Sequence, residues 1–118
     1  MPRILFIEKE DRTRALLQSR LKAEAKIKFA PCMKAAWQKL HSRKFDLILW
    51  NTVNDAAAET NLSETLKRLS TNLCGGRIVV FADSEALPAA GLPEGNVCFE
   101  KVPTDDEDLV ALIQSNLP

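Results

Sequence analysis

The segment Phe45–Asn51, with the sequence FDLILWN, constrains the fold of this chain more than any other stretch. Four consecutive apolar residues, Leu47 to Trp50, stand between Asp46 and the polar Asn51. A short, uninterrupted apolar run with polar residues at both ends is typical of a β-strand that is covered on both faces. We therefore expect a buried central strand here.

Strand-like and helix-like segments alternate along the rest of the chain. Buried strands are predicted at Arg3–Glu8 and Arg77–Ala82, and a last strand at Val97–Glu100. The alternating, lysine-containing segment Lys26–Ala30 is predicted to be an edge strand. Between the strands, apolar residues recur at helical spacing. The four stripes are Leu17/Leu21, Met33/Ala36/Trp37/Leu40, Leu62/Leu66/Leu69 and Val110/Ile113/Leu117.

Capping and turn-forming residues predict where these segments begin and end. Asp11 or Thr13 is expected to cap the first helix, Asp55 the third, and Thr104 the last, within the capping box Thr104-x-x-Glu107. Cys74-Gly75-Gly76 is predicted to form a turn. Residues 83–96 include two prolines and two glycines, so a helix there is expected to be short or broken.

Five alternations of strand and helix predict an α/β fold, because helical crossovers of this length join parallel strands. The expected architecture is a three-layer, doubly wound sheet. At 118 residues the chain is long enough for one domain with its own core, and no linker, repeat or low-complexity segment divides it. We predict a single domain over residues 1–118.

Composition excludes several classes of function. Sixteen Lys and Arg residues balance sixteen Asp and Glu residues, so net charge gives no reason to expect binding to nucleic acid or to an anionic membrane. The apolar runs are far shorter than the ~20 residues of a membrane span. Three cysteines without a CxxC spacing and a single histidine argue against a disulfide framework or a zinc site. We expect a cytoplasmic protein.

Polar residues at the ends of the predicted strands are the candidates for a functional site. The carboxyl ends of parallel strands meet at one edge of a sheet, where ligands of α/β proteins usually bind. The residues expected to meet there are Glu8, Lys9, Glu10, Asn51, Ala82 and Lys101. They would form either a pocket for a cation or phosphate, or a set of solvated loop charges.

The order and spacing of five segments resemble the receiver domain of bacterial two-component response regulators, across essentially the whole chain. The segments are RILFIEKED, Arg14-x-x-Leu17-x-x-x-Leu21, AAWQKL before FDLILWN, RIVVFA, and FEKVPTDDEDL. The resemblance implies a flavodoxin-like (βα)5 fold with a parallel sheet in the order 2-1-3-4-5.

The resemblance also implies a phosphorylation site whose key residues are missing. Receivers are phosphorylated on an Asp at the end of the third strand, which aligns with Asn51, and a neutral amide is a poor nucleophile. The acidic pair that holds Mg²⁺ in receivers aligns with Glu8 and Lys9. With an ammonium there, Mg²⁺ binding is expected to be weak or absent, even if Glu10 compensates in part, and no other cofactor is expected.

The switch positions implied by the family have changed as well. The Ser or Thr after the fourth strand aligns with Ala82, and the aromatic residue of the fifth strand aligns with Cys98. Lys101 is the one retained member of the set, although the usual Lys-Pro has become Lys101-Val102-Pro103. The chain thus resembles an atypical receiver, or pseudo-receiver. We expect Lys101 to pair with a nearby acid, Glu8 or Glu10, and hypothesise that Lys9 occupies the metal position.

Two classes of function remain open. The first is a non-enzymatic, non-phosphorylatable signalling module of the two-component or phosphorelay type, which acts by binding a protein partner such as a histidine kinase or an output domain, or a second copy of itself. Its expected interaction face contains Ala86, Leu87 and Leu92. The second is a receiver that still handles phosphate or a small ligand, with Glu10, Asp55 and Lys101 as working groups.

Overall fold

The computed structural model describes residues 1–53, 55–82 and 96–117, and within these it contains a five-stranded sheet and four helices. In chain order the elements are β1 (Arg3–Ile7), α1 (Asp11–Leu21), β2 (Lys26–Ala30), α2 (Met33–Ser42), β3 (Phe45–Asn51), α3 (Ala56–Ser70), β4 (Leu73–Ala82), β5 (Val97–Lys101) and α4 (Asp106–Asn116). None of these helices is long and apolar enough to cross a membrane.

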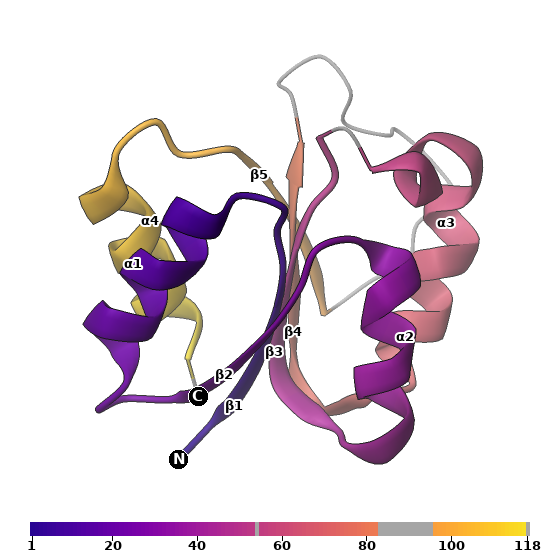
Figure 1. Ribbon diagram of the computed structural model, residues 1–118. Helices are drawn as coiled ribbons and strands as arrows, with labels where there is room; N and C mark the ends of the chain where they lie inside the picture. The colour runs from indigo at the N-terminus through magenta and orange to yellow at the C-terminus, as the bar shows by residue number, and fades with distance from the viewer. Residues whose placement is uncertain (54, 83–95, 118) are drawn as a thin grey trace.

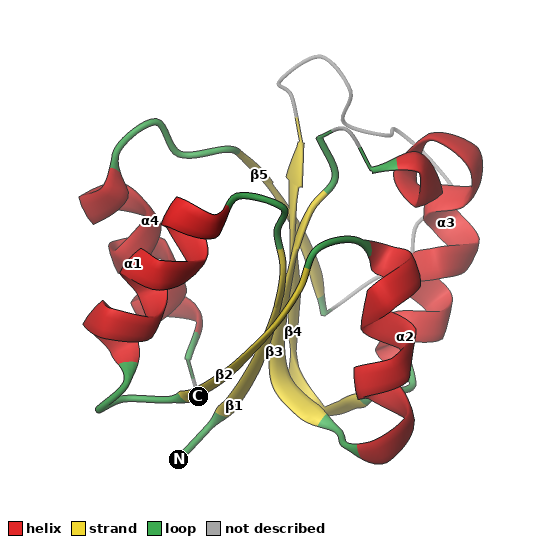
Figure 2. Ribbon diagram, viewed as in Figure 1, coloured by secondary structure: helices red, strands yellow, loops and turns green. Residues whose placement is uncertain are grey.

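The sheet is entirely parallel, and its strands lie in the order β2-β1-β3-β4-β5. This confirms the predicted α/β fold, with β3 in the centre and β2 at an edge. Helices α1 and α4 cover one face of the sheet, and α2 and α3 cover the other (Figures 1 and 2). The expected short or broken helix in residues 83–96 lies almost wholly outside the described residues, as does the expected interaction face.

Two hydrophobic clusters, one on each side of the sheet, make up the core. Because side chains alternate between the faces of a strand, β1 sends Ile4 and Phe6 towards α1 and α4, and Leu5 and Ile7 towards α2 and α3. The same alternation in β3 places Asn51 on the α1 and α4 side, in line with Leu47 and Leu49. The continuous apolar runs of the sequence are therefore explained by burial on both faces.

The predicted turn at Cys74–Gly76 is wrong, because β4 begins at Leu73 and includes these residues. The pairing of β3 with β4 shifts between Phe45 and Leu47, which accommodates this irregular start. A Cβ atom on Gly76 would overlap the backbone carbonyl of Asp46. Gly76 is therefore needed because the two strands approach each other closely here. In the sequence alone, the same glycine is read as a sign of a turn.

Two predicted helix caps are also wrong. Glu10, rather than Asp11 or Thr13, is the N-cap of α1, and it makes no side-chain capping hydrogen bond. Asp105, rather than Thr104, caps α4, and its carboxylate accepts a hydrogen bond from Glu107 N at 2.8 Å. The prediction that Asp55 caps α3 is confirmed, since its carboxylate accepts from Ala57 N at 3.2 Å.

Candidate functional site

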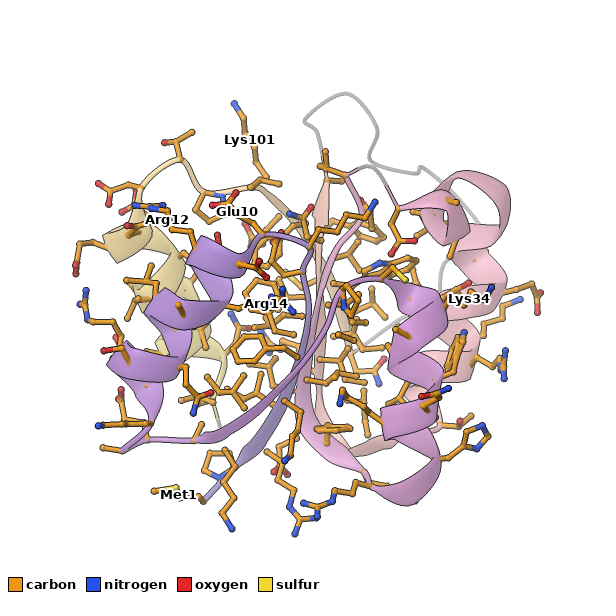
Figure 3. The ribbon with its side chains drawn as sticks, viewed as in Figure 1. Met1, Glu10, Arg12, Arg14, Lys34 and Lys101 are labelled. Atoms are coloured by element: carbon orange, nitrogen blue, oxygen red, sulfur yellow. The ribbon has the colours of Figure 1, made fainter. Side chains whose placement is uncertain are left out.

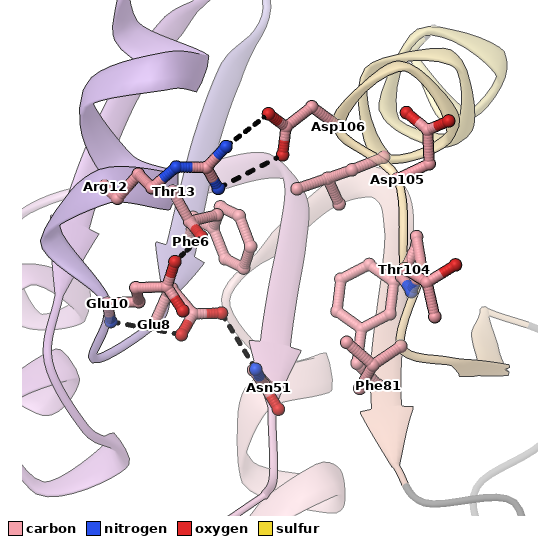
Figure 4. A pocket seen from close by; sticks show the side chains of 13 residues that line it. Phe6, Glu8, Glu10, Arg12, Thr13, Asn51, Phe81, Thr104, Asp105 and Asp106 are labelled. Carbon is pink, nitrogen blue, oxygen red and sulfur yellow. Dashed lines mark hydrogen bonds and ion pairs between the residues drawn. The ribbon is translucent and has the colours of Figure 1, made fainter.

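A pocket of about 250 Å³ lies at the carboxyl ends of β1, β3 and β4, between the N-terminal ends of α1 and α4 (Figure 4). Its floor is apolar, because the buried rings of Phe6 and Phe81 lie there with 6.2 Å between their centroids. Its walls are polar. The lining residues are Phe6, Glu8, Glu10, Arg12, Thr13, Asn51, Phe81, Val102, Pro103, Thr104, Asp105, Asp106 and Leu109.

Asn51 is fixed in this pocket by hydrogen bonds at both ends of its amide. Its Nδ2 donates to Glu8 Oε2 at 2.8 Å, and its Oδ1 accepts from Val53 N at 3.1 Å. The other carboxylate oxygen of Glu8 accepts from Glu10 N at 3.2 Å. The ends of β1 and β3 are thus joined through one amide and one carboxylate (Figure 4).

Four carboxylates and one guanidinium line the pocket, so its electrostatic character is acidic. The guanidinium belongs to Arg12, which is held away from Glu8 by Asp106, with Arg12 Nη2 2.9 Å from Asp106 Oδ2. Glu10 Oε1 accepts from Thr13 Oγ1 at 3.2 Å. This lining favours binding of a cationic or neutral ligand over binding of an anion.

The structure brings together only some of the residues predicted to meet at this edge. Glu8, Glu10 and Asn51 line the pocket, whereas Lys9, Ala82 and Lys101 are not among its lining residues. Ala82 is buried at the end of β4, opposite Lys101 in the strand register. Lys101 is exposed and points away from the pocket (Figure 3). Within the described residues no ion pair links it to Glu8 or Glu10, so that expected contact is not formed.

Asp55 lies on the other side of the sheet from the pocket, buried at 4% exposure. One oxygen, Oδ2, accepts hydrogen bonds from Trp50 Nε1 at 2.9 Å and from Met33 N at 3.0 Å, while Oδ1 accepts from Ala57 N. These contacts join the end of β3 to the starts of α2 and α3. With its oxygens engaged by three donors, this carboxylate is a structural link.

Cys98, which the resemblance aligned with the aromatic residue of receivers, is partly buried. Its thiol donates to Glu100 Oε1 at 3.4 Å. Burial, followed by this hydrogen bond, raises the pKa of Cys98 above the ordinary value of 9.0. The thiol is therefore protonated near neutral pH, which is the unreactive form of a cysteine.

Sequence inspection missed the second wall of the pocket, which comes from residues 102–106 and from Arg12. A sequence signal for this wall was present, since the acidic run Asp105–Asp108 follows Pro103 at the start of a predicted helix. What the sequence does not reveal is that α4 packs beside α1, which brings Asp106 to Arg12. Within the described ranges no group of three or more His, Cys, Asp or Glu side chains is placed to hold a metal ion.

Solved structures similar to this chain include response regulator receiver domains. The chain is similar to the N-terminal domain of the nisin resistance regulator NsrR, a lantibiotic response regulator, with a TM-score of 0.69, 18% identity, and coverage of 100% of this chain and 99% of that one. It is equally similar to a receiver domain protein from Bacillus halodurans, with a TM-score of 0.70, 18% identity and the same coverage.

A third similar structure is the receiver domain of the hybrid histidine kinase CckA, with a TM-score of 0.67, 21% identity, and coverage of 98% of this chain and 99% of that one. No family model and no curated protein sequence matches the chain. The fold is therefore that of a receiver domain over the full length of the chain. At these identities the likeness establishes the fold alone.

Proposed function

We propose that the chain is a receiver-like module of two-component or phosphorelay signalling that is not phosphorylated at Asn51 and acts by binding a protein partner. The observation that carries this proposal is the hydrogen bond from Asn51 Nδ2 to Glu8 Oε2. A receiver needs a carboxylate nucleophile at this position and a metal ion beside it. Here an uncharged amide fills the position and uses the nearest carboxylate as its own acceptor.

The donor set of the pocket supports weak or absent Mg²⁺ binding as part of this proposal. Mg²⁺ prefers octahedral oxygen ligands that include one or two carboxylates. Glu8 is already engaged by Asn51 Nδ2 and by Glu10 N, and Lys9 replaces the second acid of the family's pair. An ion would have to break these hydrogen bonds to reach Glu8.

The direct test is incubation with a small phosphodonor, such as phosphoramidate, and Mg²⁺. We expect no mass increase of the intact protein, and no amide NMR shifts near Asn51 on adding beryllofluoride with Mg²⁺. A stoichiometric phosphoryl adduct that disappears in Asn51→Ala would overturn the proposal.

The variant Asn51→Asp separates the missing nucleophile from the rest of the site. It places a second carboxylate beside Glu8, so we expect it to bind Mg²⁺ more tightly than the wild-type protein does, because paired carboxylates attract a divalent cation. We still expect no efficient phosphorylation, since Lys9 and Ala82 remain unchanged. The control Glu8→Gln keeps an acceptor for Asn51 and should gain no Mg²⁺ affinity. Efficient Mg²⁺-dependent labelling of Asn51→Asp would show that Asn51 is the only residue that prevents phosphorylation.

A second candidate function is favoured by the pocket itself, which is large enough for a small ligand. Of the three working groups expected for this function, only Glu10 lines the pocket, since Asp55 is buried on the opposite side of the sheet and Lys101 points outward. The four carboxylates of the lining disfavour phosphate. Amide shifts of Asn51 and Thr104 on adding inorganic phosphate at millimolar concentration would support this alternative over the first.

A further inference from the structure

The outer surface of α2, together with Arg68 at the end of α3, is rich in positively charged side chains. Residues 31–45 contain four Lys or Arg side chains and one His, without a single Asp or Glu. Within the described part of the chain, no ion pair joins Lys34, Arg43 or Lys44 to a carboxylate. By contrast, all three arginines of α1 are paired, Arg12 with Asp106, Arg14 with Asp11 and Arg20 with Glu107.

Stabilisation of the helix ends explains only part of this charge. Basic side chains in the last turn of a helix complement its dipole, which accounts for His41 in α2 and for Lys67 and Arg68 in α3. Lys34, however, lies in the first turn of α2, where a cation is unfavourable and where no acidic residue offsets it. It extends outward from the face of the molecule that α2 covers (Figure 3).

A small hollow between α2 and α3 gives this surface a specific feature. It measures about 80 Å³ and is lined by Trp37, Leu40, His41, Arg68, Thr71 and Asn72. The guanidinium carbon of Arg68 lies 4.1 Å from the centroid of the Trp37 ring. This cation–π contact holds the guanidinium over the ring, and its N–H groups donate no hydrogen bond to another described residue. The edge of a guanidinium fits a carboxylate through two parallel hydrogen bonds.

We propose that this surface, formed by Lys34, Trp37, His41, Arg43, Lys44 and Arg68, binds an acidic segment of a partner protein, with one carboxylate in the hollow against Arg68. Lys34, Trp37 and His41 follow one another at i, i+3 and i+7, so they form a stripe along one side of α2. Arg68 lies beside the middle of that stripe. The lysines and Arg43 would attract the partner, and Arg68 would fix its position.

The size of the hollow and the distribution of charge favour an acidic peptide over nucleic acid. A volume of about 80 Å³ equals that of two to three water molecules at ~30 Å³ each, which suits a carboxylate and is too small for a base. The molecule as a whole has no net charge, and the acidic pocket and the run Asp105–Asp108 lie at the far side. A long polyanion would reach these carboxylates and be repelled by them, whereas a short acidic segment would not.

A second copy of the chain is a poorer occupant, because its own acidic run is already engaged. Asp105 caps α4, Asp106 is paired with Arg12, and Glu107 is paired with Arg20. The inference rests on the proposed function only in that both require binding to a protein. Phosphodonor labelling tests Asn51 separately, and the variants below do not touch that site.

The test is an NMR titration of the intact chain with hexaglutamate as the probe and hexaglutamine as the uncharged control. We expect amide shifts confined to α2, to the turn that follows it, and to residues 65–72, and we expect hexaglutamine to cause none. Arg68→Gln should weaken hexaglutamate binding about 10-fold, and raising the salt concentration should weaken it in the wild-type protein as well.

A matched pair of charge reversals locates the site. Lys34→Glu should weaken binding about 5-fold or more, whereas Lys22→Glu, an equal charge change at the exposed end of α1, should change it less than 2-fold. Absence of shifts at millimolar hexaglutamate, or equal effects of the two reversals, would overturn the proposal. Tighter binding of a 12-nucleotide single strand, or self-association that Lys34→Glu abolishes, would also overturn it, in favour of nucleic acid or a second copy.

Discussion

The helix pairs that cover the two faces of the sheet are joined by polar contacts of opposite kinds. On the α1 and α4 side the contacts are exposed and spread along the helices, with Arg12 paired to Asp106, Arg20 to Glu107 and Gln114 bonded to Glu24. On the α2 and α3 side the buried carboxylate of Asp55 joins β3 to both helices. Water competes with the first kind of contact and not with the second.

Two aspartates allow a direct comparison between these faces. Asp55 and Asp105 are both N-caps, and each accepts a hydrogen bond from the backbone N–H two residues later. Asp105 is exposed, and its carboxylate accepts from no other described residue, whereas Asp55 is buried and also accepts from Trp50 and Met33. Loss of the Asp55 carboxylate should therefore cost more free energy of unfolding than loss of the Asp105 carboxylate, because no water reaches the buried donors to replace it.

Asp55→Ala should give the largest loss of stability. It leaves the indole N–H of Trp50 and the backbone N–H of Met33 buried without an acceptor, and it removes a helix cap, at a cost of roughly 3 kcal/mol in the free energy of unfolding. Asp55→Asn keeps one acceptor oxygen and should lose less. Denaturant unfolding monitored by circular dichroism measures both. The matched control is Asp105→Ala, expected to cost about 1 kcal/mol; equal losses for the two alanine variants would disprove the comparison.

Gly76→Ala should damage the sheet that both faces share. The added Cβ overlaps the Asp46 carbonyl, so β3 and β4 must move apart where their register shifts, at a cost of about 2 kcal/mol. Arg77→Ala, at the next residue and exposed, is the control and should change the free energy of unfolding by less than about 0.5 kcal/mol. If Gly76→Ala left the free energy of unfolding unchanged, the two strands would be shown to move apart there at no cost in stability.

The apolar pattern of the sequence was sufficient to predict the fold, because burial on both faces makes three strands continuous apolar runs and leaves stripes on the helices. Phe45–Asn51 was predicted with its observed bounds. The start of β4 was missed, since Gly76 is needed for strand approach and glycine alone is a turn signal. The caps of α1 and α4 were misplaced, because several neighbouring polar residues at each helix start could serve as the cap.

The candidate site was predicted less completely, for a physical reason. Residues at strand ends could be assigned to one edge of the sheet from topology, and Glu8, Glu10 and Asn51 do meet there. Whether a side chain points into the pocket or outward depends on loop geometry, which the sequence does not reveal. Glu10 lines the pocket, whereas Lys101 points outward. The link from Trp50 to Asp55 had a detectable signal, since an indole N–H in a fully apolar run needs an acceptor nearby.

Asn51→Asp should have an intermediate effect that depends on pH. The amide donor to Glu8 is lost and two carboxylates become neighbours, so the free energy of unfolding should fall by about 1 kcal/mol near pH 7. The repulsion is present when both carboxylates are ionised and disappears when one of them is protonated in acid. Unfolding measured from about pH 4 to 7 should show the deficit growing with pH; a deficit independent of pH would contradict this.

Arg20→Gln should have the smallest effect, because its ion pair with Glu107 is exposed to water. Arg20 holds the pKa of Glu107 below its ordinary value of 4.5, first through the hydrogen bond and then through its charge. A lowered pKa in the folded state stabilises the protein above pH 4.5, and this stabilisation is lost as the pH falls through the folded value. The variant should therefore fall slightly below the wild-type protein in stability near neutral pH, match it in acid, and approach it again in high salt. A deficit as large as that of Asp55→Ala would contradict the view that burial, and not the number of contacts, decides which pair of helices is more strongly held in place.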